Sequence, residues 1–213
     1  MSVDFTDINI YSSIRERIET LSGKVTVLIN NVGIMNSVPV KFSNETTNPE
    51  FNTQMLICNI FSVVKMCEIV LPIMKKEKFG IVVNISSSMA ALPYPYFAVY
   101  SSTKRFVTHF TTALSIELRH NGIVFQDLTP NQVKTNLTKD VVSSLYVVSA
   151  PSFVKYALNS IGKELHTNAH PKHKIVDIFP KFSFWIPEII RNPIINYFMK
   201  NLDNKKKDSK IYP

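Results

Sequence analysis

Three residues in the middle of the chain have the types and the spacing needed for acid–base chemistry on a carbonyl group. Ser87 follows an apolar run, Tyr100 comes 13 positions later, and Lys104 lies four positions after Tyr100. Residues four apart share one face of a helix, and a nearby ammonium favours the phenolate form of a tyrosine. We therefore expect Lys104 to lower the pKa of Tyr100, while the Ser87 hydroxyl binds and polarises a carbonyl oxygen.

Each of these residues also has a purely structural interpretation. Tyr100 could pack with Phe97 and Phe106 as an aromatic cluster, and the serines at positions 86–88 could form an ordinary loop. A Tyr-x-x-x-Lys pair alone arises by chance in many helices. A serine at the end of a strand, followed at this distance by Tyr-x-x-x-Lys at the start of a helix, is much more specific and favours catalysis.

The elements that must position these residues alternate along the chain. Continuous apolar runs, which are typical of strands covered on both faces, occur at residues 25–29, 80–85 and 123–128, and further strands are expected at residues 3–5 and 174–178. Helices are predicted over residues 10–21, 49–76, 98–120 and 151–161. Because strands and helices alternate without hairpin signals, we expect an α/β fold, a Rossmann-like parallel sheet in three layers.

The composition argues against several kinds of site. The five glycines lie at least ten positions apart, so the sequence contains no Gly-rich phosphate-binding loop. Cys58 and Cys67 share one predicted helix and do not suggest a disulfide framework. His166, His170 and His173 cluster without the thiol or carboxylate spacing of a metal centre, so no metal site is expected.

The formal charge of +8 is compatible with nucleic acid, an anionic membrane surface or a phosphorylated ligand. Part of the excess is Lys200 and the lysines at 205–207, which indicate a solvated tail, and no nucleic-acid partner is expected. Because the chain starts with polar residues, no signal peptide is predicted. Because the sequence lacks an apolar stretch of about 20 residues, no membrane span is predicted either. The aromatic residues 178–199 contain three prolines, so we expect short helices that lie in a membrane interface, cap a substrate pocket or contact a second copy.

Further segments point to one family. Asn30-Asn31-Val32-Gly33 ends a predicted strand, Asn59 lies inside the first long helix, Pro130 opens a polar segment that runs to Thr135, and Asp4 stands just before the first helix. In their order and spacing, these segments and the Ser87, Tyr100 and Lys104 motif resemble the short-chain dehydrogenase/reductase family over nearly the whole chain.

Finer features are similar to one branch of that family, the 17-beta-hydroxysteroid dehydrogenase and very-long-chain 3-oxoacyl-CoA reductase group. They include Asn-Asn-Val-Gly instead of Asn-Asn-Ala-Gly, and Asn84-Ile-Ser-Ser87. The resemblance implies an NADP(H)-dependent oxidoreductase that interconverts a carbonyl and a hydroxyl on a lipid-like small molecule, either a 3-oxoacyl-CoA or a 17-oxosteroid. It also implies association with the endoplasmic reticulum membrane, and it allows a homodimer.

The resemblance implies a role for each matching residue. Tyr100 would be the general acid, Lys104 would hold the nicotinamide ribose, Ser87 would orient the substrate carbonyl, and Asn59 would position a water molecule that links Lys104 to a proton relay. The remaining matches would bind the cofactor: Asn30 and Gly33 along the cleft, Val133 and Thr135 at the nicotinamide, and Asp4 at the adenine ring.

The resemblance also predicts how the chain is organised. Residues 1–178 are expected to form a partial short-chain dehydrogenase domain, and residues 179–213 an aromatic and basic C-terminal segment. The family's first strand, Gly-rich turn and first helix would precede Val3, so the sequence predicts a fold that is truncated at its N-terminus. This leaves a second function open, that of a catalytically incompetent isoform or fragment that acts as a binding or scaffold module.

Overall fold

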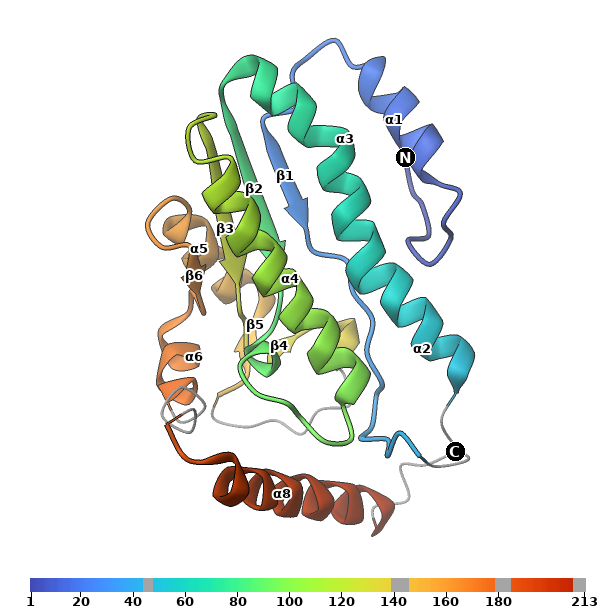
Figure 1. Ribbon diagram of the computed structural model, residues 1–213, viewed down its shortest axis with the longest axis vertical. Coiled ribbons are helices and arrows are strands. Elements are labelled where there is room, and N and C mark those ends of the chain that lie inside the picture. Colours follow the sequence, from blue (N-terminus) through green and yellow to red (C-terminus); the bar gives the residue numbers. More distant parts are fainter. Residues whose placement is uncertain (44–47, 139–145, 179–184, 209–213) are drawn as a thin grey trace.

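The centre of the fold is a parallel sheet of four strands (Figure 1). The computed structural model describes residues 1–43, 48–138, 146–178 and 185–208. Its main sheet has the order β1-β2-β3-β6, and every neighbouring pair of strands is parallel. The strands are β1 (Val27–Asn30), β2 (Gly80–Ile85), β3 (Ile123–Leu128) and β6 (His166–Thr167). The predicted α/β fold and its strands at 80–85 and 123–128 are confirmed.

Helices cover the two faces of the sheet. On one face lie α1 (Tyr11–Glu19), α4 (Ala98–Glu117) and a long helix made of α2 (Pro49–Leu56), a π-helical turn (Ile57–Phe61) and α3 (Ser62–Glu77). On the other face lies α5 (Ala150–Ser160). The remaining elements are the 3-10 turns Ser88–Ala90 and Asn136–Thr138, the parallel strand pair β4 (Val133–Lys134) and β5 (Val148–Ser149), and the helices α6 (Pro171–Val176) and α8 (Glu188–Asp208).

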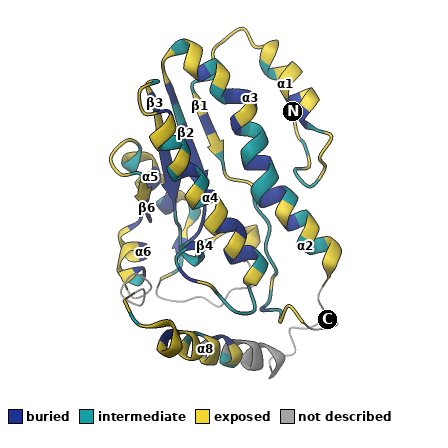
Figure 2. Ribbon diagram, in the orientation of Figure 1, coloured by how far each residue is buried: buried dark blue, intermediate teal, exposed yellow. Residues whose placement is uncertain are grey.

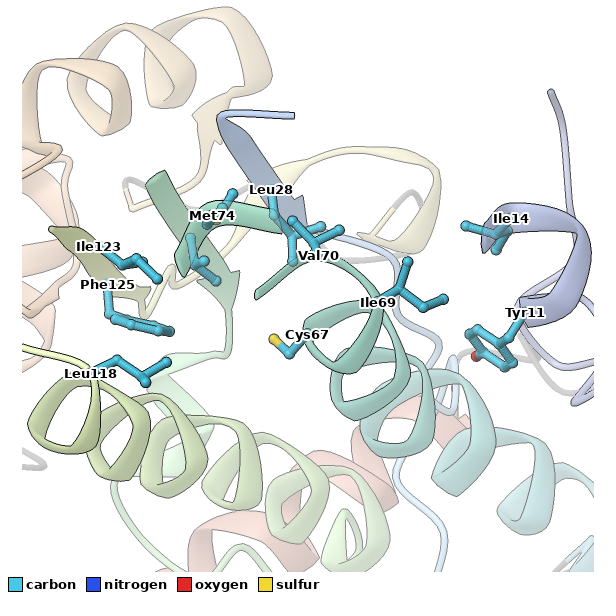
Figure 3. Packing of buried hydrophobic residues seen from close by; sticks show 11 residues of the cluster. Tyr11, Ile14, Leu28, Cys67, Ile69, Val70, Met74, Leu118, Ile123 and Phe125 are labelled. Atoms are coloured by element: carbon cyan, nitrogen blue, oxygen red, sulfur yellow. The ribbon is translucent and has the colours of Figure 1, made fainter. Parts of the chain in front are cut away.

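Two apolar cores, one on each face, follow from the alternation of side chains along β2. Val82 joins the core beneath α3 and α4, whereas Val83 joins the core beneath α5. The first core extends outwards to α1, and Figure 3 shows Ile69 of α3 pointing toward Tyr11 and Ile14 of α1. The sheet thus separates two packed layers, as the three-layer prediction requires.

The long helix Pro49–Glu77 is apolar and long enough to cross a membrane, and it is the one such helix in the described part of the chain. Length and composition alone do not make it a membrane span, so the expectation that the chain has no such span stays a prediction. Met55 and Met74 of this helix are fully buried in the fold, and 39% of its most apolar stretch is buried. The helix starts where the Asn48 side chain accepts a hydrogen bond from the Phe51 N–H at 3.1 Å, with Pro49 in the first position.

The strand predicted at residues 174–178 is wrong. Most of this segment belongs to α6, and the fourth strand of the sheet is β6, a few residues earlier. The side chain of His170 accepts a hydrogen bond from the Lys172 N–H at 3.2 Å, and Pro171 occupies the first helical position. These two helix-start signals outweigh the β-branched residues of the segment.

The two ends of the described chain also differ from the predictions. Residues 3–5 form no strand, because the Asp4 carboxylate accepts hydrogen bonds from the backbone N–H and the hydroxyl of Thr6 and so closes a local turn. Near the other end, α8 is one helix of 21 residues instead of short pieces. Pro193 lies inside α8 and removes one backbone hydrogen bond without ending the helix. Pro180 lies outside the described residues.

Candidate active site

The predicted catalytic residues lie near the carboxyl ends of the strands. Parallel strands deliver the segments that follow them to one edge of the sheet, and here Gly33 follows β1 while Ser87 follows β2. Helix α4 begins at the same end of the molecule (Figure 1), so its first turns carry Tyr100 and Lys104 there. The side chains of Ser87, Tyr100 and Lys104 are exposed by only 8%, 7% and 4%.

Ser87 and Tyr100 interact through their hydroxyl groups. The backbone of Ser87 is extended, and its Oγ accepts a hydrogen bond from the Met89 N–H at 3.1 Å, which fixes the side chain at the start of a 3-10 turn. Burial raises the pKa of Tyr100 above its ordinary value, and the hydrogen bond with Ser87 offsets part of this increase. The phenol is therefore protonated at neutral pH, which is the state that a proton donor needs.

Lys104 reaches from α4 to the end of β2. Its Nζ donates a hydrogen bond to the Ile85 carbonyl at 3.0 Å and lies 5.8 Å from the centre of the Tyr100 ring. Burial lowers the pKa of Lys104 to about 8. The net pKa of Tyr100 is raised, because burial of the phenol outweighs the hydrogen bond with Ser87, and the predicted lowering of this pKa by Lys104 stays a prediction.

Asn59 connects three segments of the site. It lies in the π-helical turn, a kind of interruption that is frequent at functional sites. Its Oδ1 accepts a hydrogen bond from the Ile34 N–H at 2.8 Å, and its Nδ2 donates to the Ile34 carbonyl at 2.9 Å and to Thr103 Oγ1 at 3.1 Å. The side chain thus holds the segment after β1 against α4, while its role in positioning a water molecule stays a prediction.

Thr103 is a site residue that the sequence analysis missed. Its side chain is fully buried, and its hydroxyl donates to the Tyr100 carbonyl at 2.7 Å while it accepts from Asn59. Its position three residues after Tyr100, on a neighbouring part of the same helix face, was the available signal. A threonine has no distinctive chemistry at that position, so the signal was too weak to use.

The backbone at Gly33 passes close to two of these residues. A Cβ at this position would lie 3.1 Å from Lys104 Nζ and 3.3 Å from Asn59 Oδ1. Asn30, three residues earlier, serves the sheet instead: its Nδ2 donates to Asn84 Oδ1 at 2.7 Å, across the paired strands β1 and β2. Gly33 therefore lies close to Lys104 and Asn59, whereas the described contacts of Asn30 are structural, and the cofactor contacts of both residues stay predictions.

The other predicted cofactor residues do not join this hydrogen-bond network. Asp4 is exposed, and its side-chain bonds within the described residues are to Thr6. Val133 begins β4 and pairs with β5. Thr135 is exposed, and its N–H donates to Thr138 Oγ1 at 3.1 Å. Their cofactor contacts stay predictions.

His173 fixes the segment after β3, which the family resemblance places at the nicotinamide. Its Nδ1 accepts a hydrogen bond from the Asn131 N–H at 3.3 Å, and its Nε2 donates to the Gln132 carbonyl at 3.2 Å. The ring is fully buried, and burial lowers its pKa. A neutral imidazole satisfies both contacts.

His166 contacts the Asp127 carboxylate at 3.0 Å. The described residues contain no group of three or more His, Cys, Asp or Glu side chains that could hold a metal ion.

Cavities of different size lie beside Ser87 and Tyr100. The one at Ser87 has a volume of about 350 Å³ and lies between α4, β3 and β6, with Arg105, His109 and Asp127 among the residues that line it. The one at Tyr100 has a volume of about 20 Å³, and Val40, Phe42 and Phe97 are among the side chains that line it. The larger space is therefore on the Ser87 side.

Comparison with protein families decides where this arrangement belongs. The model of the short chain dehydrogenases matches residues 1–145. The chain belongs to the short-chain dehydrogenase family. Within that family, it is 36% identical to 17-beta-hydroxysteroid dehydrogenase type 3 of Rattus norvegicus over 179 residues, or 84% of this chain and 57% of that protein.

Other members of the short-chain dehydrogenase family show the same likeness. The chain is 35% identical to very-long-chain 3-oxoacyl-CoA reductase-A of Danio rerio over 176 residues, which cover 83% of this chain and 54% of the relative. It thus spans a little over half the length of these two curated relatives. A short-chain dehydrogenase from Sphingobium yanoikuyae in complex with NADPH shares the fold, with a TM-score of 0.69, 21% identity, and coverage of 85% of this chain and 72% of that one.

Proposed function

We propose that this short-chain dehydrogenase interconverts a carbonyl and a hydroxyl group on a lipid-like small molecule, with NADP(H) as the redox partner. The observation that carries the proposal is the buried arrangement of Ser87, Tyr100 and Lys104 at the carboxyl ends of the strands, with Asn59 locked beside them. A scaffold protein has no need for these buried polar groups in one place, so the alternative of a binding module is not favoured.

The residues of the site divide the work on the carbonyl between them. Bound NADP(H) supplies or accepts the hydride. The hydroxyl groups of Ser87 and Tyr100 would bind the carbonyl oxygen together, and Tyr100 would donate its proton as negative charge develops there. Lys104, with a pKa of about 8, is largely protonated at neutral pH and would stabilise the phenolate that remains.

The residues present fit the nicotinamide end of such a cofactor. A side chain at Gly33 would crowd Lys104 and Asn59, so the missing Cβ leaves these two polar side chains uncrowded for a ribose or nicotinamide group. Among the described residues, no closely spaced glycines form a pyrophosphate-binding turn. The complex of a related fold with NADPH supports NADP(H) as the first cofactor to test.

The substrate class rests on the relatives and on the cavity at the site. The relatives named above are a hydroxysteroid dehydrogenase and a 3-oxoacyl-CoA reductase, which both suggest an oxo group on a large apolar molecule. The cavity of about 350 Å³ beside Ser87 falls within the size range of small-molecule sites. The endoplasmic reticulum location and the homodimer expected from the resemblance stay predictions, to be checked by imaging a tagged chain and by sedimentation.

A comparison of two tyrosine variants tests the reaction. We expect the chain to oxidise NADPH in the presence of a 3-oxoacyl-CoA or a 17-oxosteroid, and Tyr100→Phe to reduce kcat by about 10²- to 10⁴-fold, because the proton donor is lost. Tyr156→Phe is the matched control, since Tyr156 is 41% exposed on α5, and it should leave kcat unchanged. NADPH affinity, measured by titration, should be nearly equal in all three proteins.

Two results would contradict the proposed reaction. One is unchanged turnover in Tyr100→Phe, which would remove Tyr100 from the proton transfer. The other is a folded chain, verified by circular dichroism, that reduces neither ketone. That second result would instead support the binding-module alternative.

A further inference from the structure

The cavity beside Ser87 carries charged side chains that the proposed reaction does not use. Arg105 and His109 of α4 line this space of about 350 Å³, and so do Asp127 of β3 and Asp177, which follows α6. A space that touches the serine expected to bind the carbonyl therefore also touches basic and acidic groups. Their accessibility decides which kind of ligand the space can hold.

The two basic side chains on α4 are open to a ligand. Arg105 and His109 are four residues apart, so they lie one turn apart on the same face of the helix. Both are exposed, and neither side chain forms a hydrogen bond or an ion pair with another residue in the described ranges. Figure 2 shows that α4 has exposed as well as buried residues along its length, whereas β2 and β3 behind it are mostly buried. Arg105 and His109 thus keep their donors available at the cavity.

The carboxylates that line the cavity are shielded from a ligand. Asp127 is fully buried, and its Oδ2 lies 3.0 Å from His166 Nδ1. Asp177 is only 5% exposed. His166 also lines the cavity, and its side chain is 42% exposed. The titratable side chains that a ligand can reach in this space are therefore Arg105, His109 and His166, which can carry positive charge but not negative charge.

We propose that Arg105 and His109 bind an anionic group of the substrate, a phosphate, sulfate or carboxylate, while Ser87 binds the carbonyl of the same molecule. This inference rests on the proposed function, which supplies the role of Ser87. The planar donors of a guanidinium match the oxygens of such groups, and the imidazole of His109 adds a further donor one turn away. An oxo substrate that carries phosphates, such as a 3-oxoacyl-CoA, therefore suits the cavity better than an uncharged 17-oxosteroid.

Equilibrium dialysis of matched ligand pairs against the full chain tests this proposal. One pair is a 3-oxoacyl-CoA and the uncharged N-acetylcysteamine thioester of the same acyl group, and the other is a 17-oxosteroid and its sulfate ester. We expect the wild type to bind the charged member of at least one pair more tightly, and less so at high salt. The double substitution Arg105→Gln and His109→Gln should reduce this preference about tenfold, because charge-assisted hydrogen bonds are lost. Arg15→Gln is the matched control, since Arg15 is exposed on α1 and does not line the cavity, and it should keep the preference.

Several outcomes would overturn the proposal. They are equal binding of the charged and uncharged members by the wild type, an unchanged preference in the double variant, equal weakening of both members of a pair, and no binding of any of these ligands. A preference confined to the steroid sulfate would support the site but assign it to an anionic steroid. Tyr100→Phe should keep the preference, because dialysis without cofactor involves no turnover. A chain that reduces neither ketone but keeps the preference would refute the proposed reaction alone, whereas an active chain without the preference would refute the anion site alone.

Discussion

Burial acts in opposite directions on the two titratable groups at the centre of the site. It raises the pKa of the Tyr100 phenol and lowers the pKa of Lys104 to about 8, because removal of water disfavours whichever form is charged. The two residues are only 7% and 4% exposed. Near neutral pH the phenol of Tyr100 is therefore protonated, and Lys104 is an ammonium whose pKa lies only about one unit above the pH.

The pH dependence of folding measures this burial at Lys104. Between pH 8 and the ordinary lysine value of 10.5, the unfolded chain binds a proton at Lys104 that the folded chain does not, so stability rises with pH in that interval. The comparison is the free energy of unfolding of the wild type minus that of Lys104→Met. This difference should increase by roughly 3 kcal/mol between pH 8 and pH 10.5. Urea unfolding at a series of pH values measures the difference.

An exposed lysine on α5 provides the control for this series. Lys155→Met removes the same charge from the surface, and its difference from the wild type should not rise with pH in this way. Groups that do not interact with Lys104 titrate equally in all three chains, so their contributions cancel in the differences, whereas Cys58 interacts with Lys104 and contributes to the Lys104→Met difference. A flat curve for Lys104→Met would mean that the ammonium stays hydrated in the folded state.

At the scale of the elements, the bounds of helices and strands were predicted correctly where a single local sequence signal determines them. The strand β2 spans the predicted residues, because a continuous apolar run follows Gly80. The helix start at Pro49 was also predicted, and the structure adds the cap at Asn48. The strand expected at 174–178 failed because two signals compete there: β-branched side chains favour a strand, whereas His170 and Pro171 start a helix.

The connection between α4 and β3 depends on Gly122. Its φ is +71°, and a Cβ there would lie 2.1 Å from the carbonyl oxygen of Lys78, the residue that follows α3. Gly122→Ala should lower the free energy of unfolding by at least about 3 kcal/mol, since backbone strain and a backbone clash add. Gly162→Ala should cost only roughly 1 kcal/mol, because Gly162 has a φ of +77° but no atom within 4 Å of such a Cβ.

Chemical denaturation of these two glycine variants separates strain from the clash. The φ angles of the two glycines, +71° and +77°, differ by only 6°, so the difference between the two losses of stability reports mainly the contact with Lys78. Equal losses would mean that the loop between α3 and β2 moves away at little cost. The same loop sets the start of β2, whose first N–H donates to the Gly122 carbonyl at 3.3 Å.

At the scale of the whole molecule, the sequence predicted which residues meet better than how they are held. Ser87, Tyr100 and Lys104 could be found because strand order and helix periodicity bring them to one edge of the sheet. The bonds from Asn59 to Ile34 and Thr103 could not, because they join segments that are distant in the sequence. The effect of burial on the pKa of Tyr100 was missed for the same reason, since it depends on everything packed around the ring.

The two faces of the sheet are covered to different extents, and adjacent residues of β1 show the difference. Leu28 is 7% exposed and belongs to the core beneath α3, whereas Ile29 points to the opposite face and is 52% exposed. Val124 of β3, on that same face, is 40% exposed. The described helices therefore leave part of this apolar face open to solvent, although parallel sheets are normally covered on both sides.

Two substitutions in β1 test whether this face is open in solution. Leu28→Thr should lower the free energy of unfolding by about 2 to 4 kcal/mol, because it leaves a cavity and buries a hydroxyl in the core. Ile29→Thr keeps a β-branched residue in the strand and should change stability by less than about 1 kcal/mol, while it reduces the binding of an apolar dye. If both substitutions destabilise the chain equally in urea, Ile29 is buried in solution. The open face would then be covered by another chain or by a segment outside the described residues.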